Sequence, residues 1–160
     1  MNAIPFKTLL ASLLLAMATP AGAQTLLRVG DPLPPVTIAD QHDQRPGIPD
    51  DTRQILFAAD NTGAGLVTRM LDARDANWLK QTHRVYLADI HKMPGLIARL
   101  VALPQLRDKP YSILLGREEA DLILFPRKKD CVSVMNVRKM KIDDISFACS
   151  DEALREAAGY

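Results

Sequence analysis

Apolar residues along the chain gather in short continuous runs, which are separated by stretches with helical spacing. Short runs bounded by polar turn residues predict strands that are buried on both faces. These runs lie at 54–59, 85–88 and 111–115. A shorter strand is predicted at 36–38, after a proline-rich lead-in. Two further runs, at 131–137 and 142–149, predict the strands of a hairpin.

The stretches between the runs predict helices. The first helix is expected over 64–73, with a short continuation that carries Trp78 and Leu79. The second is expected to begin at Pro94 and to end at Pro104, because proline lacks the N–H group that a helix interior needs. Helical spacing gives it an apolar stripe. That stripe consists of Leu96, Ile97, Leu100 and Val101.

The order of these elements defines the fold class. One or two helical turns are predicted at 118–125, and a final helix follows a cap at Ser150 or Asp151. Strands that alternate with helices imply right-handed crossovers and a mainly parallel sheet, to which the hairpin adds antiparallel strands. The sequence therefore predicts an α/β sandwich with a central mixed sheet of about five strands and flanking helices.

Residues 1–23 have the pattern of a secretory signal peptide. Lys7 precedes an apolar run at 9–18, and small residues lead up to Ala23. The run is shorter than the roughly 20 apolar residues that span a bilayer, and no later segment suits an integral membrane anchor. We expect cleavage after Ala23, export to the periplasm and a single domain over 24–160. A buried N-terminal helix is the alternative.

Composition and motifs exclude several function classes. The chain has 160 residues with 20 Lys+Arg and 19 Asp+Glu, so its formal net charge of +1 gives no broad reason to expect nucleic acid or anionic lipid as partner. No glycine-rich phosphate cradle and no Ser/His/Asp or paired-carboxylate spacing stands out. We predict no cofactor, no metal and no catalytic residue. The basic residues at 127–129 are expected to be solvated.

The chain resembles the thioredoxin-like superfamily, in its redoxin and peroxiredoxin-like branch. The lead-in VGDPLPPVTIADQHDQ at 29–44 is similar to the opening of those proteins, and 54–59 is similar to the core strand that delivers their active site. Lys109, Pro110 and Tyr111 resemble the segment with a cis-proline that faces the active-site helix; an X-Pro bond costs about 0.5–1 kcal/mol to hold cis. The resemblance implies a three-layer thioredoxin-like sandwich.

The same resemblance locates a departure from the family's chemistry. Thioredoxins place Cys-x-x-Cys at the N-terminus of the helix after the core strand, where the helix dipole and free N–H groups lower the pKa of a thiol. Thr62 and Gly65 stand at those two positions here, and no cysteine lies between 24 and 130. The resemblance therefore implies the fold and argues against an oxidoreductase or a peroxidase.

Cys131 and Cys149 lie at the open ends of the predicted hairpin, which we expect to be outside the place where the fold does its chemistry. A structural disulfide is the first interpretation in an oxidising compartment, and it would contribute about 3 kcal/mol. The register that pairs Met135 with Ile145 brings the cysteines opposite each other, whereas a one-residue slip separates them, and a bulge would reconcile the two. Two free thiols or a redox pair are the alternatives.

These observations predict an exported, redox-inactive thioredoxin-like protein with a binding or accessory role and an unknown protein or peptide partner. A free helix N-terminus beside an aromatic residue forms a usable groove. The candidate groove residues are Thr62, Gly63, Pro110 and Tyr111. One alternative is a thiol–disulfide oxidoreductase that uses Cys131 and Cys149. The other is a copper-handling protein that uses His91 and Met93.

Overall fold

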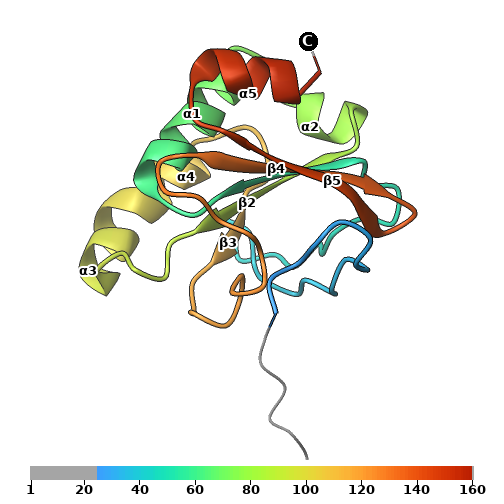
Figure 1. Cartoon of the computed structure of the whole chain (residues 1–160). Coiled ribbons are helices and arrows are strands. Elements are labelled where there is room, and N and C mark those ends of the chain that lie inside the picture. The colour runs from blue at the N-terminus through green and yellow to red at the C-terminus, as the bar shows by residue number, and fades with distance from the viewer. Residues whose placement is uncertain (1–24, 160) are drawn as a thin grey trace, which may run out of the picture.

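The computed structural model describes residues 25–159, so the predicted signal peptide and its cleavage site lie outside the described residues. The strands are β1 (Gln54–Ala58), β2 (Arg84–Asp89), β3 (Leu114–Gly116), β4 (Val132–Arg138) and β5 (Lys141–Ala148). They form one sheet in the order β3-β2-β1-β4-β5 (Figure 1). β1, β2 and β3 are parallel, and β4 is antiparallel to both β1 and β5. The predicted mixed sheet is confirmed.

The helices lie on one side of the sheet. They are α1 (Asn61–Asp72), α2 (Trp78–Gln81), α3 (Gly95–Ile97), the π-helix η1 (Ala98–Ala102), α4 (Leu103–Arg107) and α5 (Asp151–Ala157). The predicted first helix, its short continuation and the final helix capped by Ser150 are all present. Between residues 25 and 159, no helix combines the length and the apolar character that crossing a membrane requires.

β1 is the centre of the molecule, and all five of its residues are buried. Successive side chains of a strand point to opposite faces, so β1 contributes to two separate apolar clusters. Leu56 and Ala58 belong to the cluster that α1, α2 and α5 cover. Ile55 and Phe57 belong to the cluster on the other face of the sheet.

The second face is covered by irregular chain rather than by a helix (Figure 1). Buried apolar residues of the chain that precedes β1 lie on it, namely Leu27, Leu33 and Val36. The strand expected at 36–38 is absent, because the lead-in crosses the sheet instead of running beside one strand. The N–H of Leu33 donates to Met140 at the β5 side, whereas Ala39 accepts from Leu115 in β3. The outer layer on this face is therefore a strap of extended chain.

The strand expected at 111–115 is displaced to β3. The side chain of Gln41, which is 1% exposed, replaces a neighbouring strand here. Its Nε2 donates to the carbonyl of Tyr111 at 2.6 Å, and its Oε1 accepts from the N–H of Ile113 at 2.8 Å. An amide side chain thus satisfies backbone groups that a ladder would otherwise pair. No peptide bond among residues 25–159 is cis, so Pro110 follows a trans bond.

The segment 118–125 forms turns instead of the expected helical turns. The carboxylate of Asp121 accepts the backbone N–H groups of Arg117 and Glu118, both at 2.9 Å. Asp side chains compete with helical hydrogen bonds in this way. The hairpin has the register in which Met135 pairs with Ile145, and a bulge follows it between Asn136 and Val137.

The helix expected to end at Pro104 continues to Arg107. We call residues 95–107, from α3 through η1 to α4, the arm. Pro104 lies in the first turn of α4, and the wider π-turns of η1 precede it. This arrangement tolerates the missing N–H of proline. The apolar stripe faces solvent, since Leu96, Ile97, Leu100 and Val101 are all exposed.

Two leucine-to-alanine variants compare the stability contribution of a core position with that of a position on the arm. Leu87 in β2 has no exposed surface, whereas Leu100 in η1 is 68% exposed. We expect Leu87→Ala to lower the free energy of unfolding by about 3 kcal/mol through loss of burial and a residual cavity. Leu100→Ala should change it by no more than about 0.5 kcal/mol. Chemical denaturation of both variants checks this, and a large loss in Leu100→Ala would place the stripe in the core.

Candidate functional site

A helix-capping carboxylate, the disulfide and a buried carboxylate lie at one edge of the sheet. The carboxyl ends of the parallel strands β1 and β2 lie there. Because β4 runs antiparallel to β1, with Ala58 opposite Val132, the start of β4 lies at the same edge. The end of β5 joins them, since Ala148 pairs with Val132. We call this the carboxyl edge, where ligands bind in many open α/β sheets.

The N-terminus of α1 projects from the carboxyl edge and is capped by Asp60. Oδ1 of Asp60 accepts the N–H of Gly63 at 2.8 Å, and Oδ2 accepts the N–H of Asp130 at 2.8 Å. One carboxylate thus satisfies a free N–H of the helix and fastens the loop that precedes β4. A side chain that carries a negative charge meets the positive end of the helix here.

The disulfide of Cys131 and Cys149 lies beside this helix terminus. A methyl group added at Gly63 would stand 2.7 Å from the carbonyl oxygen of Cys131, so the two backbones are in direct contact. The expectation that both cysteines lie outside the place where the fold does its chemistry is therefore wrong. The antiparallel direction of β4 and β5 returns their open ends to the carboxyl edge. Cys131 is 3% exposed, and Cys149 is exposed.

The four residues of the candidate groove do not lie together. Thr62 and Gly63 are in the first turn of α1, at the carboxyl edge. The hydroxyl of Tyr111 instead donates to Asp72, the last residue of α1, at 3.0 Å. The segment before a parallel strand enters the sheet at the opposite edge, and this places Pro110 and Tyr111 at the far end of the helix.

Pro110 and Tyr111 line a different hollow, which they share with Pro46 and Leu79. Burial raises the pKa of the Tyr111 phenol, and the neighbouring carboxylate of Asp72 raises it further. The phenol therefore stays neutral and acts as a hydrogen-bond donor that joins the end of α1 to the entry of β3.

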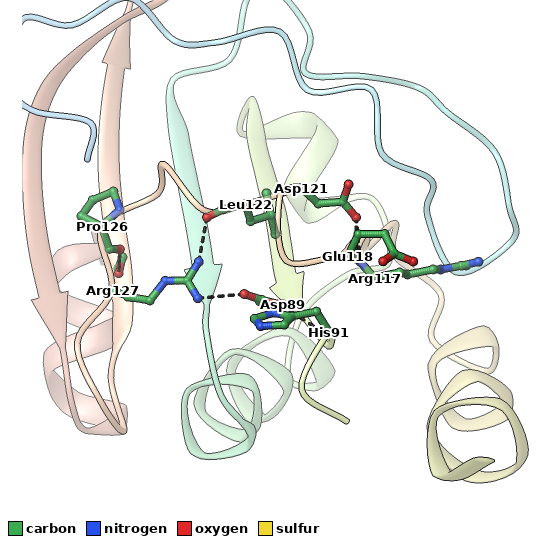
Figure 2. Close-up of polar contacts among 9 residues, drawn as sticks. Asp89, His91, Arg117, Glu118, Asp121, Leu122, Pro126 and Arg127 are labelled. Carbon is green, nitrogen blue, oxygen red and sulfur yellow. Dashed lines mark hydrogen bonds and ion pairs between the residues drawn. The ribbon is translucent and has the colours of Figure 1, made fainter. Parts of the chain in front are cut away.

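A buried carboxylate ends β2 at the same edge (Figure 2). The side chain of Asp89 is 3% exposed and has two partners. Its Oδ1 lies 2.6 Å from Nδ1 of His91, and its Oδ2 accepts from Nη1 of Arg127 at 2.9 Å. Arg127 also donates to the carbonyl of Leu122 at 2.7 Å and lies over the ring of Phe57. This arginine was expected to be solvated; it closes the apolar cluster on the second face.

His91 is oriented by Asp89, so Nε2 is the ring nitrogen left for another contact. His91 and Met93 line one hollow together with Arg99 and Arg117. Across residues 25–159, no group of three or more His, Cys, Asp or Glu side chains is arranged to hold a metal ion. The candidate copper ligands His91 and Met93 are thus two side chains that line the same hollow.

Comparison with known proteins defines the fold. No protein-family model matches the sequence, and no curated protein matches it. A putative protein disulfide isomerase from Bacteroides thetaiotaomicron is 13% identical, with a TM-score of 0.54 over 82% of this chain and 88% of that one. A peroxidoxin from Mycobacterium tuberculosis is 11% identical, with a TM-score of 0.53 over 82% and 94%. A thio-disulfide isomerase from Thermus thermophilus is 17% identical, with a TM-score of 0.50 over 82% and 94%.

The chain has a thioredoxin-like fold. Identities this low carry the fold and no activity. Within the fold, the sequence correctly locates the helix that follows the core strand, and Thr62 and Gly65 lie near the start of that helix. It misses the pairing of Asp89 with His91 and Arg127, although a polar residue directly after a buried strand is a signal for the carboxyl edge.

Two glycines of α1 provide a matched test of the contact with Cys131. Gly63→Ala should destabilise the protein by about 1–3 kcal/mol, because its new methyl group meets a backbone carbonyl that cannot turn aside. Gly65→Ala meets only the flexible end of Arg69 and should stabilise α1 by up to about 1 kcal/mol. Thermal unfolding of both variants measures the difference. Equal stability of the two would argue against the close approach of β4 to α1.

The buried carboxylate of β2 can be compared with an exposed one. Asp89→Asn leaves Arg127 and His91 without their negative partner in a largely buried place, and we expect a loss of about 2–4 kcal/mol in unfolding free energy. Asp143→Asn removes a surface pair with Arg138, whose side chain is 75% exposed, and should cost less than about 1 kcal/mol. Urea denaturation of the two variants checks this ranking, and the reverse order would contradict it.

Proposed function

We propose that this chain is an exported thioredoxin-like protein that binds a protein or peptide partner and does not catalyse thiol–disulfide exchange. The observation that carries the proposal is the N-terminus of α1. Asp60 caps the helix there, and Thr62 and Gly65 occupy the positions that the family resemblance gives to the two cysteines. The pattern of residues 1–23 supports export.

The electrostatics of the helix terminus support the absence of exchange chemistry. A reactive thiol in this fold gains its low pKa from free N–H groups and the positive end of the helix dipole. Here the carboxylate of Asp60 already accepts from Gly63 and from Asp130, the residue before Cys131. Its negative charge disfavours a second anion nearby. A thiolate formed at Cys131 would therefore lack the stabilisation that a catalytic thiol needs.

The place of the disulfide in the hairpin supports a structural role. It follows directly on the pairing of Val132 with Ala148, so it closes the open end of the β4–β5 hairpin. Cys149 precedes Ser150, whose hydroxyl oxygen accepts the N–H of Ala153 and caps α5. The crosslink therefore joins the start of β4, which contacts α1, to the end of β5, directly before the cap of α5.

A thiol–disulfide oxidoreductase is the second candidate, favoured by the exposure of Cys149, whose disulfide partner Cys131 contacts the α1 terminus. In that mechanism a substrate thiolate would attack the sulfur of Cys149, form a mixed disulfide with it and release Cys131 as the thiolate. Cys131 is the buried member of the pair, so the leaving thiolate would form in an apolar place, which raises the pKa of a thiol.

Replacing both cysteines separates the two candidates. Oxidised wild-type protein should show no free thiol in the native state and no turnover in an insulin-reduction assay. The double variant Cys131→Ser/Cys149→Ser should lose about 3 kcal/mol of stability. It should still capture the same partner as wild type from a periplasmic extract at a temperature where it is folded. Insulin turnover by wild type that disappears in the double variant would establish the oxidoreductase instead.

A further inference from the structure

The arm presents large apolar side chains to solvent. Leu96 is 71% exposed and Leu100 is 68% exposed, while Ile97 and Val101 are each 49% exposed. They are neighbours on two successive turns and so form one continuous ridge. In Figure 1 the arm projects beyond the sheet at the left of the view. Scattered surface leucines are ordinary, but a contiguous apolar patch marks an interaction surface.

The inner side of the arm is also apolar, but it carries smaller residues. Ala98 and Ala102 are half-buried, and Leu103 and Leu106 pack against the helix-side core. No residue of α3, η1 or α4 is fully buried. A helix that carries apolar side chains on both its inner and its outer side is normally covered on both. The outer ridge therefore has the composition of a surface that is buried against another apolar surface.

The charge of this segment differs from that of the whole chain. No acidic residue occurs from 90 to 107, whereas the complete sequence is almost neutral. Arg107 is held by Asp43 and by the carbonyl of Gln41. The side chains of Lys92 and Arg99 are exposed and make no hydrogen bond or ion pair with any residue between 25 and 159. Two cations that form no ion pair among the described residues thus accompany the apolar ridge.

We propose that the arm binds the surface of an anionic lipid bilayer. The four ridge side chains enter the boundary between headgroups and acyl chains, and Lys92 and Arg99 contact lipid phosphates. Basic residues beside an apolar helix face give this mode of binding, in which the helix lies in the plane of the interface. The arm has 13 residues, fewer than the roughly 20 that span a bilayer. The proposal goes beyond the proposed function and does not depend on the state of the disulfide.

The charge of the arm favours a bilayer over a second copy of the chain. A symmetric dimer through the ridge would bring Arg99 of one copy close to Arg99 of the other, and like charges oppose such an interface. A stable dimer also buries about 800 Å² on each partner, which is more than two turns of a short helix provide. Insertion into lipid needs no matching surface, only a protruding apolar edge and nearby cations.

Vesicle co-sedimentation of residues 24–160, the chain that cleavage after Ala23 would leave, tests the proposal. Wild type should bind phosphatidylglycerol vesicles clearly more strongly than phosphatidylcholine vesicles, and added salt should weaken the binding. Leu96→Asp/Leu100→Asp should weaken it by about tenfold or more, because charged side chains enter the bilayer poorly. Phe147→Asp is the matched control: Phe147 is 40% exposed on β5, away from the arm, so binding should not change. Thermal unfolding confirms that each variant is folded.

Two further variants report on charge and depth. Lys92→Glu/Arg99→Glu should abolish the preference for phosphatidylglycerol. Leu100→Trp should give a fluorescence blue shift on phosphatidylglycerol vesicles, whereas the same change at Phe147 should not. Trp78 is the only native tryptophan and lies in α2, so the unmodified chain supplies the background.

Three results would overturn the proposal. They are absence of wild-type binding to phosphatidylglycerol vesicles, binding that the aspartate variant retains, and a dimer in sedimentation velocity that the aspartate variant disperses. The dimer would assign the ridge to a second copy of the chain. None of these outcomes bears on the insulin and partner-capture assays, so the proposed function can fail or hold separately.

Discussion

The burial of β1 on both faces is the constraint on which the rest of the structure depends. Ile55, Leu56 and Phe57 have no exposed surface. β2 pairs with one edge of this strand, and β4 pairs with the other. Each face then needs an apolar cover, which the helices supply on one side and irregular chain on the other. The direction of β1 also fixes where the chain leaves the sheet. This brings Asp60, the disulfide and the carboxylate of Asp89 to one edge.

The elements that the sequence predicts well are those whose signals are local. The apolar run of β1, the spacing of Leu66, Val67, Met70 and Leu71 in α1 and the cap at Ser150 each identify an element from a few neighbouring residues. The misplaced elements depend on distant partners. Residues 111–113 have the sequence of a strand, but the side chain of Gln41 forms hydrogen bonds with their backbone groups in place of a neighbouring strand. This glutamine lies about seventy positions earlier, so no local pattern predicts its contact. Proline usually ends a helix, but here the helix continues through Pro104 because the preceding turns form a wider π-helix.

The site was harder to predict than the fold, because strand direction decides which residues meet. Thr62 and Gly63 were correctly placed at a helix terminus, but Pro110 and Tyr111 enter the sheet from the opposite edge. The same reasoning, applied to the antiparallel hairpin, returns Cys131 to the terminus of α1. Helical spacing correctly identified the ridge of the arm as one face. Spacing alone cannot say whether such a face points inward or outward.

The irregular strap across the second face imposes an order on folding. Gly30 and Leu33 donate to Ile142 and Met140, so the strap closes between opposite ends of the described chain. Contacts of such long sequence separation form late, because the whole intervening loop loses freedom when they close. A chain that emerges N-terminus first therefore keeps Leu27 and Leu33 uncovered until the hairpin has emerged and paired. During that interval the nascent protein presents an incomplete core, and a holdase chaperone that recognises extended apolar segments would find its substrate there.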